Sequence, residues 1–362
     1  MQAEIITHVL DSIRHSRDVK ELRAVRDKFH ERCGPPVPES QNETYVQEIN
    51  LIHDALIRRT IQLSEQRLAG DGMGPPPVSY AFVLFGSGGR REQTLWSDQD
   101  NGLIYADPSV ETAETASSYF EALSDLIVFN LQTVGYPPCE GNVTAMNAQW
   151  RKSITEWNQM IYSWMTAGTW EQIRHLLIVA DARCVYGNPE IAEQAAQFYA
   201  ETFRNTPQVA ESMLNNTLRH KILLGVFGNF LKEQYGEDAG SIDIKYGAYI
   251  PFVNGIRLLS VCSGITETST LARLAELKRK GSLQAETLER WAESFVFIMM
   301  LRSTASHKLE SGMFTTSGKL KVKLLTKEVT ERLRSSLRDG KGLQRTVQKT
   351  AAAFAAKGGG SR

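Results

Sequence analysis

Six consecutive residues without a charge, Tyr80–Phe85, limit the fold of this chain more narrowly than any other segment. The run is short, apolar and free of polar alternation, which predicts a strand that is buried on both faces. The sequence GSGG follows it directly at residues 86–89, and the composition of residues 101–105 predicts a second short strand. Two buried strands need cover on both faces of their sheet, so the rest of the chain must supply packed helices.

Helical periodicity dominates the remainder. Within residues 1–69, apolar residues recur every three or four positions, and helices are also expected at residues 109–134 and at about 149–165. Residues 176–187 form either a third strand or the end of a buried helix. From about residue 190 the chain is helical again, including a long amphipathic stretch at 207–234. The predicted fold class is α+β, a small mixed-sheet domain flanked by N- and C-terminal helical regions and mostly α by residue count.

Composition places the domain boundaries. Residues 69–78, AGDGMGPPPV, hold three glycines and three prolines, which predicts a break in regular structure. We therefore expect an N-terminal helical region at 1–69, a linker at 70–77, a sheet-containing domain at 78–190 and a C-terminal helical domain at 191–350. Residues 351–362, which end in KGGGSR, are expected to form a flexible tail.

Charge and cysteine content exclude several classes of protein. Lys and Arg number 41 and so do Asp and Glu, and this zero balance argues against a chain whose main task is to coat nucleic acid or an anionic membrane. The four cysteines are dispersed and show no zinc spacing, which favours reduced thiols and a cytoplasmic protein. The first residues lack the apolar core of a signal peptide, and no apolar run is long enough to span a membrane.

The glycine-rich turn at residues 86–89 is the first part of a motif that carries chemistry. A strand that ends in Gly-Ser-Gly-Gly and leads into a helix presents backbone N–H groups to phosphate oxygens, and the hydroxyl of Ser87 adds a donor. The turn is not a Walker loop, because the Gly-Lys-Ser/Thr ending is missing. It is not a dinucleotide fingerprint either, because the third glycine is missing.

Two carboxylates follow within the same motif. Asp98 and Asp100 are two residues apart, so on an extended chain both side chains point to the same face. Carboxylates held together repel each other unless a cation lies between them, and Mg²⁺ prefers oxygen ligands. A phosphate-binding turn beside a carboxylate pair is what phosphoryl or nucleotidyl transfer requires.

The combined motif, GSGGRREQTLWSDQDNGLIY at residues 86–105, resembles the signature of the DNA polymerase β-like nucleotidyltransferase superfamily. It is most similar to the nucleotidyltransferases related to protein-PII uridylyltransferase, which are often fused to CBS and cyclic-nucleotide-binding domains. Three further stretches resemble that family: NAQWRKSITEW at 147–157, ADARCVYG at 180–187 and DIKYGAYIPFVNGIRLLSV at 243–261. The resemblance covers roughly residues 78–330, so it implies that residues 78–190 form a nucleotidyltransferase domain.

The resemblance also implies roles for individual residues. Asp98 and Asp100 would bind two Mg²⁺ ions, with Mn²⁺ as a possible substitute, and Asp181 would be the third metal-binding and catalytic carboxylate, next to the acceptor hydroxyl. An alternative for Asp181 is a surface ion pair with Arg183. Arg90 would neutralise phosphate charge, and Glu92 would orient Arg90 or the turn. The expected nucleotide-binding residues are Gly86, Ser87, Gly88, Gly89, Arg90, Glu92, Ser97, Arg151 and Lys245.

Together these features predict an Mg²⁺-dependent nucleotidyltransferase with a signalling or regulatory role. It would transfer a nucleoside monophosphate from ATP or UTP to an acceptor hydroxyl, on a protein rather than on nucleic acid. Two alternatives stay open: a catalytically weak nucleotide-sensing module, and an RNA-tailing or RNA-binding protein. The second would use residues 319–349, which hold ten basic and three acidic side chains, although a solvated helical face is the simpler interpretation.

Overall fold

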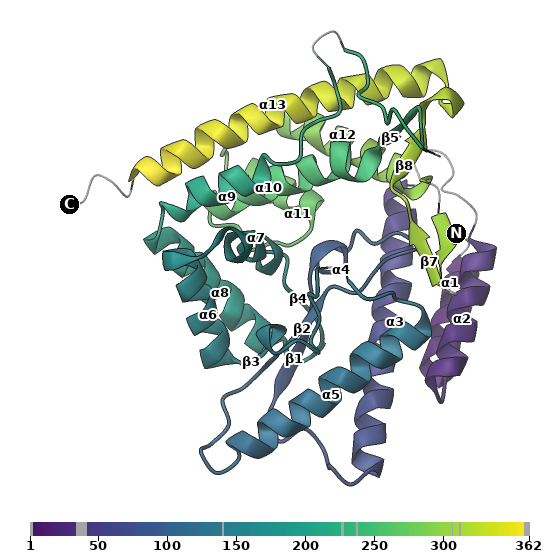
Figure 1. The fold of residues 1–362 in the computed structure, drawn as a ribbon, viewed down its shortest axis with the longest axis vertical. Coiled ribbons are helices and arrows are strands. Elements are labelled where there is room, and N and C mark those ends of the chain that lie inside the picture. The colour runs from purple at the N-terminus through teal and green to yellow at the C-terminus, as the bar shows by residue number, and fades with distance from the viewer. Residues whose placement is uncertain are drawn as a thin grey trace.

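A computed structural model of the chain describes residues 3–33, 42–139, 141–225, 228–236, 238–305, 307–310 and 313–357. Helix accounts for 65% of the structure and strand for 8%, which confirms the predicted, mostly helical α+β fold. Figure 1 shows the small sheet in the middle, α1, α2, α3 and α5 on one side of it, and the helices of the C-terminal half on the other. In the described part of the chain, no helix combines the length and apolar character needed to cross a membrane.

The first half of the chain holds the sheet and its cover. Its elements are α1 (Ala3–His15), α2 (Val19–Arg32), α3 (Asn42–Gly70), β1 (Tyr80–Leu84), α4 (Gly86–Arg90), β2 (Asn101–Tyr105), α5 (Ala113–Val134), η2 (Ala148–Trp150), β3 (Arg151–Ser153), α6 (Ile154–Ala167), α7 (Trp170–Val179), β4 (Arg183–Gly187) and α8 (Pro189–Asn205). The strand order is β3-β2-β1-β4, in which β1 runs antiparallel to β2 and β4, and β3 runs parallel to β2. The sheet is therefore mixed, as predicted.

Alternate side chains of β1 enter two different cores. Phe82, with its neighbours on the same face, packs into a core shared with α1, α2, α3 and α5. Val83 points the other way, into a larger core that continues through α6, α7, α8 and the C-terminal helices. Both side chains are fully buried, which explains why the strand sequence lacks polar alternation. Although AGDGMGPPPV separates α3 from β1 along the chain, α3 packs directly on the sheet.

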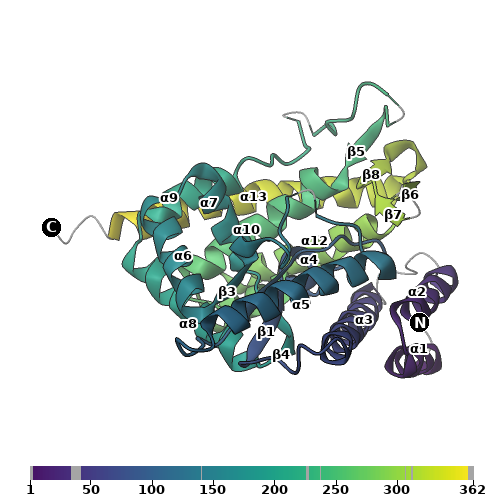
Figure 2. The ribbon, with the colours of Figure 1, turned by 60° about the horizontal axis from the view of Figure 1, so that its bottom comes forward.

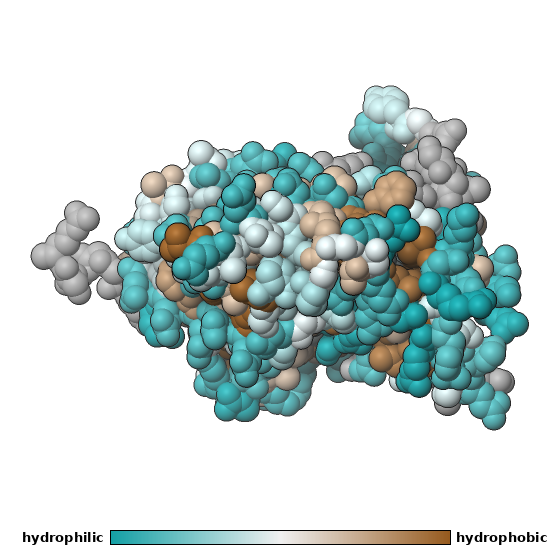
Figure 3. Space-filling view, turned by 90° about the horizontal axis from the view of Figure 1, so that it is seen from below, coloured by the Kyte–Doolittle hydropathy of each residue, from teal (hydrophilic) through white to brown (hydrophobic). Residues whose placement is uncertain are grey.

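The C-terminal half is a layer of helices capped by one long helix. Its elements are α9 (Val209–Thr217), β5 (Ser241–Asp243), the π-helix η3 (Lys245–Tyr249), α10 (Ile250–Cys262), α11 (Thr270–Arg279), α12 (Ala285–Ser303), β6 (His307–Glu310), β7 (Met313–Thr316), β8 (Lys319–Lys321), η4 (Val322–Leu324) and α13 (Lys327–Lys357). Both ribbon views show α13 lying along α10 and α12, on the far side of these helices from the sheet (Figures 1 and 2). From below, hydrophilic residues cover most of the surface, and apolar residues form small separate groups (Figure 3).

Four predicted elements need correction. The helix expected from about residue 149 begins only at Ile154, because residues 151–153 pair with β2 and Ser153 caps the helix. Residues 176–187 are not one element but the end of α7 followed by β4. The long helix expected at 207–234 is wrong beyond Thr217, since the described residues that follow form turns and an isolated bridge between Leu224 and Phe230. Residues 351–357 continue α13 instead of forming a tail, and residues 358–362 lie outside the described part.

Candidate active site

The turn after β1 forms α4, whose glycines allow two other segments to approach. Gly86 has φ +52°, in the left-handed region that favours glycine, and a Cβ there would collide with the carboxylate of Asp100. A Cβ on Gly89 would overlap the backbone oxygens of Asp181 and Leu84. The sequence GSGG is therefore needed to bring Asp100 and the start of β4 against α4.

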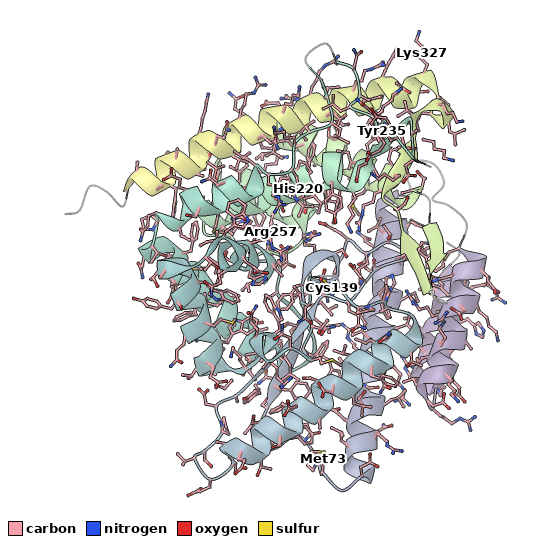
Figure 4. The ribbon with its side chains drawn as sticks, in the orientation of Figure 1. Met73, Cys139, His220, Tyr235, Arg257 and Lys327 are labelled. Atoms are coloured by element: carbon pink, nitrogen blue, oxygen red, sulfur yellow. The ribbon has the colours of Figure 1, made fainter. Side chains whose placement is uncertain are left out.

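A cavity of about 490 Å³ opens between α4 and the C-terminal helices. From the first half of the chain it is lined by Gly86, Ser87, Arg90, Asp98 and Asp100. Lys245 lines it from the C-terminal half, so the structure brings six of the predicted site residues to one cavity. His220 and Arg257 also line it, and Figure 4 shows these two side chains in the centre of the molecule.

Asp98 and Asp100 form the acidic part of this cavity. Asp98 is exposed and Asp100 is half-buried. Burial and the negative charge of Asp98 raise the pKa of Asp100 to about 7, although a hydrogen bond with the Cys139 side chain acts in the opposite direction. Burial is the larger of these two effects, and repulsion between the two carboxylates adds to it. A hard divalent ion fits this donor set, because it would relieve the repulsion and bind oxygen ligands.

Asp181 does not join this pair, which corrects the expectation that it is a third metal ligand. Its carboxylate is fully buried and accepts hydrogen bonds from the guanidinium groups of Arg90, Arg257 and Arg273. Burial alone would raise the pKa of Asp181, but these three cations hold it well below its usual range. Among the described residues, no three His, Cys, Asp or Glu side chains are gathered closely enough to hold a metal ion. Nor does Asp181 form the surface ion pair with Arg183, which contacts Asp54 instead.

Arg90 connects α4 to the C-terminal helices. Its guanidinium donates to Glu92 Oε2 at 2.7 Å and to the hydroxyl of Tyr249 at 2.8 Å, in addition to Asp181. The Tyr249 hydroxyl in turn donates to Glu92 at 2.6 Å, and burial raises the pKa of Tyr249 to about 12, which keeps that proton in place. Arg90 therefore presents its positive charge at the cavity wall while its N–H groups are held by protein partners. Glu92 orients Arg90, and its other oxygen accepts a hydrogen bond from the backbone N–H of Thr270.

The remaining predicted residues lie elsewhere. Ser97 is buried and donates its hydroxyl hydrogen to the carbonyl of Thr94, so it does not line the cavity. Arg151 lies on β3, where it donates to the carbonyls of residues 145 and 146 and pairs with Glu121. Gly88 and Gly89 are buried residues of α4 itself and are absent from the cavity wall. These four assignments as direct nucleotide contacts are not supported by the geometry.

Sequence reasoning missed most of the cavity wall outside the motif: three residues of α7 and nine of the second half of the chain. These residues are Arg174, Leu177, Ile178, Asn216, Arg219, His220, Tyr246, Tyr249, Ile250, Asn254, Arg257 and Arg302. The stretch at 243–261 contains five of them, and Arg257 could have been noticed as a cation within an otherwise apolar helix. Asn216 lies at the end of α9, and Arg219 and His220 lie in the turn that follows it, where the sequence pattern predicted a continuing helix. Among the described residues, neither Arg219 nor Lys245 is within ion-pair distance of a carboxylate, and both line the cavity, where an anion can contact them.

The charge of the cavity wall suits a polyphosphate bound through cations. Six cationic side chains and two carboxylates line it. Asp100 lies against Gly86, and the charges of Arg90 and Lys245 act on it. A triphosphate could thus contact cations along its length and meet the carboxylate pair at one position, through a metal ion.

Comparison with protein families agrees with this geometry. Residues 39–171 match the family described as putative nucleotidyltransferase DUF294. Residues 207–351 match the family described as putative nucleotidyltransferase substrate binding domain. The two matches cover the β1–α4 turn with its carboxylate pair and the opposite wall of the cavity, respectively. The chain therefore belongs to this nucleotidyltransferase family. Among curated proteins, the comparison finds no significant match.

The two adjacent arginines of the motif allow a sharp test of this cavity. We expect Arg90→Ala to weaken binding of a non-hydrolysable triphosphate with Mg²⁺ at least about tenfold, because it removes a charge from the wall and releases Tyr249 and Glu92. Arg91→Ala should stay within about threefold, because Arg91 is exposed and faces Asp54, 3.9 Å away. Isothermal titration measures both affinities. A larger loss for Arg91→Ala would place the phosphates on the other side of α4.

Proposed function

We propose that this protein is an Mg²⁺-dependent nucleotidyltransferase that transfers a nucleoside monophosphate from ATP or UTP to an acceptor hydroxyl. The observation that carries the proposal is the cavity in which Ser87 and the Asp98–Asp100 pair face cationic side chains of the substrate-binding half. The family description supports the reaction class, and the carboxylate pair supports metal dependence. A module that only senses nucleotide would need less negative charge at this point of the cavity.

Asp98 and Asp100 are the residues that would hold Mg²⁺. When bound, the ion would offset phosphate charge and favour departure of pyrophosphate. Ser87 and the first backbone N–H groups of α4, which have no partner within the helix, would hold phosphate oxygens. Arg219 and Lys245 would bind the part of the triphosphate that lies toward the C-terminal half.

The transfer step is a substitution at the α-phosphorus. The acceptor oxygen forms a bond to this phosphorus while the bond to the bridging oxygen of the β-phosphate breaks, and pyrophosphate leaves. The acceptor loses its proton to solvent at the exposed Asp98 side of the cavity. Tyr249 and Glu92 hold Arg90 in place, so positive charge is already positioned where negative charge is transferred to the leaving group.

The proposed acceptor is a protein side chain, and the role is regulatory. The zero net charge and the resemblance to protein-PII uridylyltransferase both favour a protein over RNA. Incubation of a cell extract with the protein and α-labelled ATP or UTP tests this choice. We expect the labelled product to be destroyed by protease and to survive ribonuclease. The reverse sensitivity would favour RNA tailing.

Metal and nucleotide should stabilise the fold together. A triphosphate brings about four negative charges next to Asp98 and Asp100, a juxtaposition that is favourable only when cations are bound. We expect Mg²⁺ with a non-hydrolysable triphosphate, at about a hundredfold excess over Kd, to add about 2.7 kcal/mol to the free energy of unfolding. Triphosphate with EDTA should add far less. Thermal melts measure both, and equal shifts with and without Mg²⁺ would contradict the metal-bridged site.

A second candidate is a nucleotide sensor without turnover. The observation that favours it is Asp181: the three arginines occupy its carboxylate, so two carboxylates line the described cavity instead of three. Such a module would bind Mg²⁺ and triphosphate but leave the α-phosphorus intact. Binding experiments cannot separate the two functions, whereas a measurement of transfer can.

A further inference from the structure

A second cavity, of about 650 Å³, adjoins α4 without belonging to the candidate active site. Arg90 lines the active-site cavity, whereas Arg91, the next residue, lines this one. Its walls come from α3, the start of α11, α12 and the arginine that begins β4. Both ribbon views show α12 between α13 and α3, so the cavity lies where the two halves of the chain meet (Figures 1 and 2).

One carboxylate in this cavity faces three arginines. Asp54 is buried and accepts two hydrogen bonds from Arg183, at 2.8 and 2.9 Å. Arg58 lies 3.6 Å and Arg91 lies 3.9 Å from the same carboxylate, too far for good hydrogen bonds. The Arg91 side chain is 61% exposed. Burial and repulsion by Arg183 and Arg58 lower the pKa of Arg91, whereas Asp54 acts in the opposite direction.

The other two carboxylates of the cavity do not pair with Arg58 or Arg91 and so do not neutralise their positive charge. Both oxygens of Glu92 already accept hydrogen bonds, from Arg90, Tyr249 and the backbone N–H of Thr270. Glu267 is exposed, and no ion pair joins it to an arginine of the described cavity. Two guanidinium groups therefore have capacity for a further anionic oxygen.

Part of the wall of this cavity is apolar. Leu51 of α3 is 46% exposed there, an unusual position for a large aliphatic side chain. Leu271 of α11, together with Phe295 and Met299 of α12, completes this wall. A concave site of this size with an apolar wall and a few converging polar groups is the usual form of a small-molecule pocket.

We propose that this cavity binds a small organic anion, with its carboxylate or phosphate on Arg91 and Arg58 and its apolar body against Phe295 and Met299. The bound anion acts as an effector of the nucleotide site. This second part rests on the proposed function, whereas the binding itself does not.

Arg183 connects the two sites. The same guanidinium that holds Asp54 also donates to the carbonyls of Gly88, at 2.8 Å, and Gly89, at 3.3 Å. These residues belong to α4, whose first residues line the nucleotide cavity. An anion that competes with Asp54 for Arg91 and Arg58 changes the position of Asp54 and hence of Arg183. Because Arg183 contacts α4, this movement changes the wall of the nucleotide cavity. By thermodynamic linkage, the factor by which the anion changes nucleotide affinity equals the factor by which the nucleotide changes anion affinity.

The first test uses 8-anilinonaphthalene-1-sulfonate, a fluorescent aromatic anion, as the probe. We expect one site per chain and an affinity at least tenfold weaker both in Arg91→Ala and in Ala272→Trp, whose indole takes up part of the cavity. Arg174→Ala, which removes a cation from the other cavity, is the matched control and should bind the probe like the wild type. Thermal melts check that each variant is folded.

The second test measures coupling. With the probe at the concentration that saturates the wild type, the Kd of a non-hydrolysable triphosphate with Mg²⁺ should change at least about threefold in the wild type and less in Ala272→Trp. Equal probe binding by the wild type, Arg91→Ala and Ala272→Trp would show binding to unrelated surface and overturn the assignment. Probe binding in the cavity with an unchanged nucleotide Kd would overturn the effector role. If triphosphate fails to bind at all, the proposed function fails, and the fluorescence result still decides the site.

Discussion

Asp98→Asn and Asp100→Asn should each reduce nucleotidyl transfer at least about a thousandfold while the protein stays folded. Each variant removes one of the two carboxylates that would hold Mg²⁺, and metal-ion stabilisation of the transferred phosphoryl group accounts for several kcal/mol. Asp100→Asn should even raise the free energy of unfolding slightly, because burial and Asp98 disfavour its charge in the absence of metal. Transfer of label from an α-labelled triphosphate measures activity, and thermal melts in EDTA measure stability.

Asp125→Asn is the matched control for these two variants. Asp125 is an exposed aspartate on α5, outside both cavities, so its substitution should leave transfer within about twofold. The metal-site assignment is contradicted if either Asp98→Asn or Asp100→Asn keeps wild-type activity, or if either unfolds.

Asp181→Asn, unlike Asp98→Asn and Asp100→Asn, should lower the free energy of unfolding. Arg90, Arg257 and Arg273 all donate to this one carboxylate, so its neutralisation leaves Arg257 and Arg273 without a counter-charge and Arg90 with Glu92 alone. Breaking such a buried pair costs about 3–5 kcal/mol of the free energy of unfolding, which urea denaturation at pH 7 measures. The pKa of Asp181 is lowered in the folded protein, so this contribution is present above about pH 4 and is lost on further acidification.

Two comparisons make this prediction specific. Asp71→Asn, which breaks an exposed ion pair with Arg67, should cost less than about 1 kcal/mol. Asp181→Glu, which keeps the charge, should retain more stability than Asp181→Asn. If Asp181→Asn keeps wild-type stability but has no transfer activity, the prediction is wrong, and Asp181 has the catalytic role that the sequence resemblance implied.

The sequence predicted the parts of the fold that local patterns determine. The apolar run in β1 and the following glycines place one strand and one turn, and the spacing of Asp98 and Asp100 brings two carboxylates to the same cavity. Gly86 is accounted for by the close approach of Asp100. Each of these features depends on a few neighbouring residues, so the local residue pattern is enough to predict it.

The interactions of Asp181 could not be predicted in this way. Its partners Arg257 and Arg273 lie 76 and 92 residues away in the sequence, and only packing of the C-terminal helices on the sheet brings them together. The short strand β3 is a similar case, since residues 151–153 carry no strand pattern and are held by pairing with β2. The second half of the cavity was missed because the turn around His220 interrupts a sequence with helical spacing.

Transfer of the α-phosphate tests the central claim most directly. The wild-type protein, a cell extract, Mg²⁺ and α-labelled ATP or UTP should yield a labelled macromolecule and released pyrophosphate in equal amounts. Neither product should exceed the background of the extract with Asp100→Asn or with EDTA. Tight Mg²⁺-dependent triphosphate binding by the wild type, with no label transferred from either nucleotide and no pyrophosphate released, would contradict the transferase and leave the nucleotide sensor.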